Sequence, residues 1–156
     1  MRALLSKIIY NVITNVFVCF FLCLAAALLA SPTIDWVNFG INYIVSFILA
    51  MAIGLFIPLT RIGRWFTALF KVDNKTYKGN IKYRLLATLI SSFIFFIIIN
   101  PSLTVLNYFI LQDMTVYECF MNWLINIPCM FLVGFLSSLI SDFGAYQVAH
   151  KIDSNF

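Results

Sequence analysis

The chain is poor in charge: only 10% of its 156 residues are Asp, Glu, Lys or Arg, and it has a single histidine. Hydrophobic residues make up 63% of it. A soluble domain of this length needs far more polar surface to cover its apolar interior. The scarcity of charge therefore excludes an ordinary soluble protein, and lipid is the expected solvent.

Residues that carry enzymatic or metal chemistry are also scarce. The one histidine, His150, lies in the C-terminal tail without a neighbouring Cys or Glu, and the four cysteines form no Cys-x-x-Cys pair. Small buried side chains are the expected role of these cysteines. The sequence has no HExxH motif, no Gly-rich phosphate loop and no paired carboxylates within an apolar stretch. We therefore expect no metal, no cofactor and no enzymatic activity.

What the sequence does contain is four long stretches without Asp, Glu, Lys, Arg or His: Ile8–Ile34, Trp36–Thr60, Leu85–Gln112 and Cys119–Ser141. Each exceeds the roughly 20 residues that a helix needs to cross the hydrocarbon core of a bilayer. The sequence predicts an all-α integral membrane protein with four transmembrane helices, which form a single membrane domain over residues 1–156.

The positions of the basic residues predict the orientation of these helices. All ten fall before the first stretch, between the second and third, or after the fourth, whereas the other two connections carry only Asp35, Asp113 and Glu118. Cytoplasmic segments collect Lys and Arg, so both termini and the 61–84 loop are predicted to be cytoplasmic, in a cell (inner or plasma) membrane. The net charge of +4 is explained by these basic residues in cytoplasmic segments. No nucleic-acid partner is expected.

The order of the stretches indicates an internal duplication. Aligning the second stretch with the fourth without gaps matches three pairs: Asn42 with Asn122, Ser46 with Asn126, and Gly54 with Gly134. The predicted repeats are residues 1–70 and 82–150, joined through the basic loop 61–84. Because each half begins on the cytoplasmic side, the repeats would be parallel, related by an approximate twofold axis along the membrane normal.

Short motifs also point to a family. The chain opens with Lys7-Ile8-Ile9-Tyr10-Asn11, and its last stretch contains Asn122-Trp123-Leu124-Ile125-Asn126-Ile127-Pro128. With the basic middle loop, these motifs resemble the small bacterial membrane proteins grouped as domain of unknown function 2798. Members look like duplicated two-helix units with an Asn and a Pro in the second helix of a unit. Here Pro128 fills that place in the second half, whereas Ile48 stands there in the first and Pro58 comes later. The resemblance implies the fold and brings no activity with it.

Amides and hydroxyls within the stretches are the candidate site. Asn42 and Asn122 each precede a second polar residue, Ser46 and Asn126, by four positions, so each pair shares one helix face. At about 1.5 Å per residue, these side chains and Asn100 fall in the outer half of the membrane, where we predict that they converge. They either hydrogen-bond between helices and fix the packing, or line a cavity for a small neutral or zwitterionic solute.

The favoured function is permeation or transport of such a solute. Coupling to protons or moving charge usually needs an ionisable residue at membrane depth, and none is present unless Asp142 is drawn inward. Pro101 supports a cavity because it weakens the third helix beside Asn100. The alternative is an accessory or assembly subunit that contacts another membrane protein, or a second copy of itself, through the faces carrying Gly54 and Gly134.

The start of the basic loop alternates cations with bulky apolar groups. Arg61, Arg64, Trp65 and Lys71 belong to this segment. Such a pattern predicts a short helix that lies in the headgroup layer, with Trp65 at the interface and the cations near anionic lipid. The lipid bilayer is accordingly the one partner that the sequence predicts directly.

Overall fold

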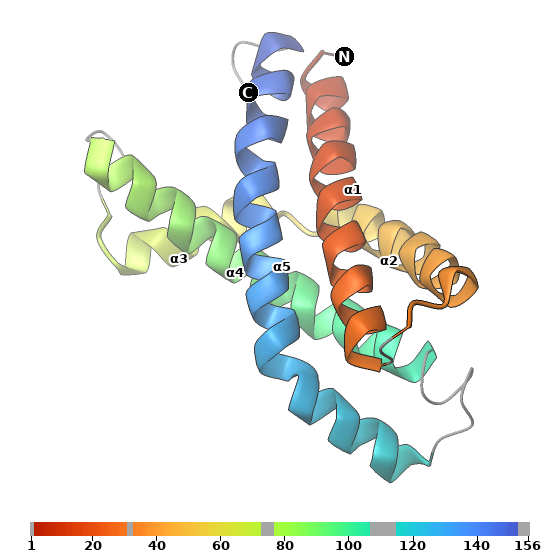
Figure 1. Ribbon diagram of the computed structural model, residues 1–156. Helices are drawn as coiled ribbons and strands as arrows, with labels where there is room; N and C mark the ends of the chain where they lie inside the picture. Colours follow the sequence, from red (N-terminus) through yellow and green to blue (C-terminus); the bar gives the residue numbers. More distant parts are fainter. Residues whose placement is uncertain (1, 31–32, 73–76, 107–114, 153–156) are drawn as a thin grey trace.

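The computed structural model describes residues 2–30, 33–72, 77–106 and 115–152. These ranges contain five helices and no strand (Figure 1): α1 (Arg2–Ala30), α2 (Trp36–Phe56), α3 (Leu59–Leu69), α4 (Tyr77–Thr104) and α5 (Val116–Ile152). The prediction of an all-α protein is confirmed. Four helices, α1, α2, α4 and α5, are long and apolar enough to cross a membrane, as expected of a multi-pass membrane protein.

The helix ends differ from the ends of the uncharged stretches. α1 begins at Arg2 and α5 continues past Asp142 to Ile152, because long charged side chains near the end of a spanning helix can reach the membrane surface. The second stretch is divided: α2 ends at Phe56, and Ile57 is extended, with φ −91° and ψ 126°. A residue before a proline disfavours the helical conformation, so Pro58 accounts for this break. Residues 107–112 of the third stretch lie outside the described residues.

Two adjacent faces of α1 pack against two different helices. One face meets α2, where Asn11 Nδ2 donates a hydrogen bond to the Gly54 carbonyl oxygen at 3.2 Å. The neighbouring face meets α5, where the Tyr10 hydroxyl donates to the carboxylate of Asp142 and Leu22 packs over Gly134. Residues on the same face of α1 recur about every four positions, as helical geometry requires. α1 is therefore the helix that holds α2 and α5 together.

The buried apolar residues form two clusters that share α1. The first joins α1, α2 and α4: Cys19, Cys23, Ala50, Ile53, Ile99 and Leu103. The second joins α1 to α5, with Phe96 of α4 at its edge: Val18, Leu22 and Met130. Consecutive pairs on α1, 18 with 19 and 22 with 23, divide between the two clusters, so α1 separates them.

α5 is not straight, and α4 crosses it obliquely (Figure 1). The first part of α5 leads away from α1, and Pro128 lies inside this helix. A proline removes one backbone hydrogen bond and bends a helix, which accounts for the change of direction. At the crossing, the ring of Phe131 on α5 meets the ring of Phe96 on α4, with centroids 5.7 Å apart.

The packing departs from the predicted twofold symmetry. Exact symmetry would make the interface of α1 with α5 equal to that of α4 with α2. Instead, α1 packs against α5 far more extensively than α2 packs against α4. The duplication therefore stays a prediction from the sequence.

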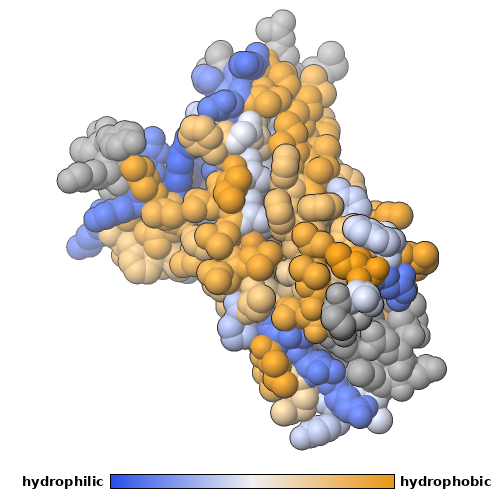
Figure 2. All heavy atoms as spheres, in the orientation of Figure 1, coloured by the Kyte–Doolittle hydropathy of each residue, from blue (hydrophilic) through white to orange (hydrophobic). Residues whose placement is uncertain are grey.

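The surface is largely apolar, as lipid exposure requires. In Figure 2, hydrophobic side chains cover most of the visible face, and hydrophilic residues gather toward the ends of the helices. A hydrophilic stripe also runs along the first part of α5, the segment that contains Asn122 and Asn126. Polar side chains along an apolar helix are unusual at membrane depth, and this stripe bears on the candidate site.

Candidate functional site

Three of the five predicted site residues lie in the interior. Asn42 and Ser46 are buried on α2, and Asn100 is buried on α4, the two helices that meet α1 in the first apolar cluster. The Ser46 hydroxyl lies 3.4 Å from the Cys23 thiol of α1. The Asn100 side chain is 6% exposed, and its Nδ2 has no hydrogen-bond partner among the described residues. Asn42 and Ser46 thus share one face of α2, and Ser46 contacts α1, whereas Asn100 is buried on the face of α4 that also carries Phe96 and Ser92, four and eight residues earlier.

The other two predicted residues, Asn122 and Asn126, lie elsewhere. Both are half-buried and belong to the part of α5 that leads away from α1. α5 packs mainly on α1 and α4, and its first part diverges from the region where α2 meets α1 (Figure 1). Similar depth in the membrane, on which the predicted convergence rested, could not reveal this separation, because depth does not identify the neighbours of each helix.

The sequence analysis missed a row of polar contacts between α1 and α2. Asn11 bonds the Gly54 carbonyl, and one turn later Asn15 Nδ2 lies 3.5 Å from the Met51 sulfur. Hydrogen bonds between spanning helices are worth about 0.6 to 2 kcal/mol each. The four-residue spacing of Asn11 and Asn15 was the available signal, but it does not identify α2 as the partner.

The two glycine faces proposed as docking surfaces are already occupied. Asn11 covers Gly54, and Leu22 covers Gly134; both residues belong to α1. Both glycines therefore face α1 of the same chain, and contact with another protein through these helices stays a prediction. These glycines allow α2 and α5 to approach α1 closely, as small residues do between membrane helices.

A second polar cluster joins α1, α4 and α5. The Tyr10 hydroxyl donates to Asp142, while the Arg84 guanidinium of α4 lies over the Tyr146 ring, 4.9 Å from its centroid. The ring of His150 stacks on Tyr146 with centroids 5.7 Å apart. Asp142 is thus drawn inward against α1. The sequence signal was the spacing of Ser138, Asp142, Tyr146 and His150, each four residues apart on α5.

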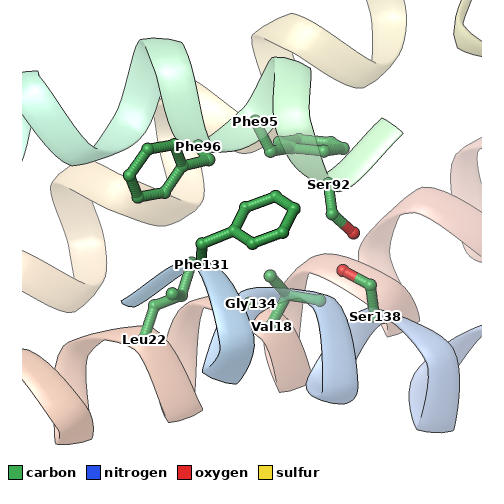
Figure 3. A pocket seen from close by; sticks show the side chains of 8 residues that line it. All are labelled: Val18, Leu22, Ser92, Phe95, Phe96, Phe131, Gly134 and Ser138. Carbon is green, nitrogen blue, oxygen red and sulfur yellow. The ribbon is translucent and has the colours of Figure 1, made fainter. Parts of the chain in front are cut away.

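A small hollow lies one helical turn from Asp142. In Figure 3 the hydroxyls of Ser92 on α4 and Ser138 on α5 face each other beside the ring of Phe131. Val18 and Leu22 of α1 complete the wall, and the space suits about one water molecule. Ser92 is 4% exposed, and its Oγ has no hydrogen-bond partner in the described part of the chain. The hollow is thus polar at one end and apolar at the other.

The predicted membrane-surface segment forms α3. Arg61, Arg64 and Trp65 are exposed on this helix, and Lys71 follows it with a positive φ of 50°. Gly63 faces Ala87 of α4, where an added Cβ would lie 3.3 Å from the alanine methyl. α3 therefore packs along the beginning of α4 on one side, and its cations and Trp65 are on the sides left open.

We expect the open side of α3 to contact lipid. Replacing Arg64 and Lys71 by Glu should expose Trp65 to an aqueous quencher in anionic liposomes, because each cation near anionic lipid contributes about 1 kcal/mol of attraction. Trp65 fluorescence in a background without the other tryptophans measures this. The same substitutions in uncharged liposomes are the control and should change little. Complete quenching of Trp65 in the unmodified protein would contradict the assignment.

Potential metal ligands do not form a metal site in the described part of the chain. Within the ranges that the structure describes, His, Cys, Asp and Glu form no group of three that could hold a metal ion. Cys19 and Cys23 are buried free thiols, and Cys129 is an exposed one. The groups described above are amides, hydroxyls, thiols, the Asp142 carboxylate, the Arg84 guanidinium and the His150 imidazole.

Comparisons with protein-family models, with curated proteins and with solved structures gave no match. The resemblance to domain of unknown function 2798 thus rests on the motifs in the sequence alone.

Proposed function

We propose that the protein is a non-enzymatic protein of a cell membrane, with both termini in the cytoplasm, that lets a small neutral or zwitterionic solute cross the bilayer. The observation that supports this proposal is the buried Asn100 amide, whose Nδ2 finds no acceptor among the described residues. Burying such a donor unpaired costs about 1–3 kcal/mol. Water or a polar solute beside this face of α4 would supply the acceptor.

The backbone around Asn100 fits this role. Pro101 follows it inside α4 and removes the N–H that would bond the carbonyl one turn earlier. The hydroxyls of Ser102 and Thr104 bond the carbonyls of Ile98 and Asn100, at 2.7 and 2.8 Å. These are the additional bonds that Ser and Thr make to the carbonyl four residues earlier, and neither reaches Ile97, whose carbonyl Pro101 leaves without its usual donor. A proline within a spanning helix weakens it locally, and discontinuous helices line binding sites in many membrane transporters.

The proposal is tested with purified protein in liposomes, using glycerol, urea and glycine as probes in a swelling assay read by light scattering. At least one probe should enter faster than into protein-free liposomes. Asn100→Leu should abolish this difference while leaving thermal stability unchanged or higher, because it removes an unpaired buried donor. Asn126→Leu is the matched control and should retain the flux, since Asn126 lies on the part of α5 that leads away.

Two outcomes would contradict the proposal. In one, none of the three probes enters faster than into protein-free liposomes. In the other, Asn100→Leu lowers stability by about 1 kcal/mol and the flux falls only in proportion to the folded protein. The second result would assign the amide to helix packing.

The orientation is tested separately by labelling. Cysteines introduced at Lys75 and Asp113, in a background without the four native cysteines, should react differently with an impermeant reagent outside intact cells. Position 113 should react and position 75 should not, because basic loops stay in the cytoplasm. Equal labelling, or the reverse, would refute the proposed topology.

An accessory or assembly subunit is a second candidate, supported by the first part of α5. Asn122 and Asn126 are half-buried there, next to exposed apolar residues such as Phe120 and Ile125, which are 53% and 69% exposed. Amides on a helix segment that its own bundle covers poorly suit a contact with another membrane helix. Light scattering in mild detergent should then show an oligomer or stoichiometric complex that Asn122→Leu with Asn126→Leu dissociates. A monomer of the unmodified chain, isolated without a partner, would exclude this function.

A further inference from the structure

One face of α4 carries two buried polar side chains with an aromatic ring between them. Ser92, Phe96 and Asn100 follow one another at intervals of four residues, so they share this face. Ser92 is 4% exposed and Asn100 is 6% exposed. Neither the Ser92 Oγ nor the Asn100 Nδ2 has a hydrogen-bond partner among the described residues. Because unpaired buried polar groups are costly, a polar molecule that reached this face would find partners on both sides of Phe96.

A ring from α5 closes the space beside Phe96. The centroid of the Phe131 ring lies 5.7 Å from that of Phe96, and the two ring planes make an angle of 84°. Aromatic rings in this edge-on arrangement are in direct contact. In Figure 3 the Phe131 ring lies between Phe96 and the hydroxyls of Ser92 and Ser138. The ring pair therefore separates these two serines from Asn100, which is one turn beyond Phe96 on α4.

The hollow beside the serines gives the Phe131 ring room to move. Its wall includes Gly134, which has no side chain, and the space suits about one water molecule. Most of the remaining wall is apolar, formed by Val18, Leu22, Phe95 and Phe96. Apolar walls of this kind hold water poorly, and hydrophobic constrictions close membrane pores for this reason. Pro128 weakens α5 three residues before Phe131, so the helix that carries the ring is less rigid there.

We propose that the Phe96–Phe131 ring pair is the constriction of the permeation path and sets the size of the largest solute that passes. This inference rests on the proposed function, since it requires a solute at Asn100. A solute that leaves the Asn100 amide along this face of α4 has to displace the two rings before it reaches the Ser92 hydroxyl. The displacement needed grows with the cross-section of the solute. Small hydrogen-bonding molecules therefore pass, and larger ones of the same chemistry are held back.

The test extends the swelling assay to solutes of increasing size: urea, glycerol, erythritol and xylitol. With the unmodified protein, the entry rate in excess of that into protein-free liposomes should fall from urea to xylitol and vanish for xylitol. Phe131→Ala should raise the entry rates of erythritol and xylitol by about fivefold or more, because the constriction loses one ring. Phe143→Ala is the matched control, since it removes a ring from the same helix at a position that is 61% exposed. It should leave the size limit unchanged.

Failure of the constriction and failure of permeation give different results. If small probes enter through the unmodified protein, and Phe131→Ala admits erythritol and xylitol no faster, the constriction is wrong and solute permeation stands. If no probe enters through either protein, permeation and the constriction fail together. A size limit that rises equally in Phe143→Ala would also overturn the inference, because the loss of any ring from α5 would then have the same effect.

A second variant and a second measurement keep the test valid if Phe131→Ala does not fold. Phe131→Leu retains an apolar side chain against α4 and should raise erythritol entry about two- to threefold. Ser92→Cys, in a background without the four native cysteines, reports whether water reaches the far side of the ring pair. In detergent, its thiol should react with iodoacetamide about tenfold faster when Phe131→Leu is also present. Equal reaction rates would overturn the constriction, whatever the swelling assay shows.

Discussion

Replacing Gly54 by Leu is expected to lower the free energy of unfolding by about 2–4 kcal/mol. A Cβ at this position would lie 3.1 Å from Cγ and Nδ2 of Asn11, and the larger side chain must push α1 away from α2. Overpacking costs about 1–3 kcal/mol, and the lost hydrogen bond from Asn11 to the Gly54 carbonyl adds about 1 kcal/mol. Unfolding by SDS in mixed micelles measures the difference.

The matched control is Gly40→Leu in the same helix. A Cβ at Gly40 would have nothing within 4 Å, so this variant should differ from the unmodified protein by less than about 0.5 kcal/mol. It carries the same change in side-chain volume and hydrophobicity. Equal stability of the two variants would show that α1 does not approach α2 at Gly54.

Replacing Tyr10 by Phe is expected to lower the free energy of unfolding by about 1.5–3 kcal/mol. The hydroxyl of Tyr10 donates to the Asp142 carboxylate, and a hydrogen bond to a charged group at a partly buried site contributes in this range. The ring, and therefore the apolar packing of α1 on α5, is retained. The loss should disappear when Asp142→Ala is also present, because the Tyr10 hydroxyl then has no acceptor at this position.

Tyr43→Phe is the control for the loss of a tyrosine hydroxyl. The ring of Tyr43 stacks between those of Phe39 and Phe47, with centroids 6.4 Å from each, and packing should hold it without the hydroxyl. A change of less than about 0.5 kcal/mol is expected. If Tyr10→Phe were equally mild, the contact with Asp142 would not be a stabilising one.

The spanning helices could be predicted because absence of charge is a local property of the chain. Pro58 likewise ends α2 through its own backbone chemistry, although the uncharged stretch continues past it. The partner of each helix could not be predicted in the same way. Helices that are apolar on all sides carry no stripe that marks the buried face, and lipid is as apolar as a helix surface. The partners of Asn11 and Asp142 could therefore be identified only from the structure.

The candidate site was predicted in part for a related reason. Asn42, Ser46 and Asn100 are buried as expected, because amides and hydroxyls in spanning helices turn away from lipid. The convergence of Asn122 and Asn126 with them was predicted from similar depth in the membrane, which does not identify the neighbours of each helix. The bend at Pro128 and the extensive contact of α5 with α1 decide where these two amides lie.

The pairing of α1 with α5 has a consequence for how the protein is made. The most extensive helix–helix interface joins the first and the last of the described helices, and α2, α3 and α4 are synthesised between them. Until α5 is inserted, the α1 face that carries Tyr10 and Leu22 has only lipid or the insertion machinery as its neighbour. Interfaces between residues far apart in sequence form late. Quality control in the membrane would therefore distinguish chains that have inserted α5 from those that have not by whether this face of α1 is covered.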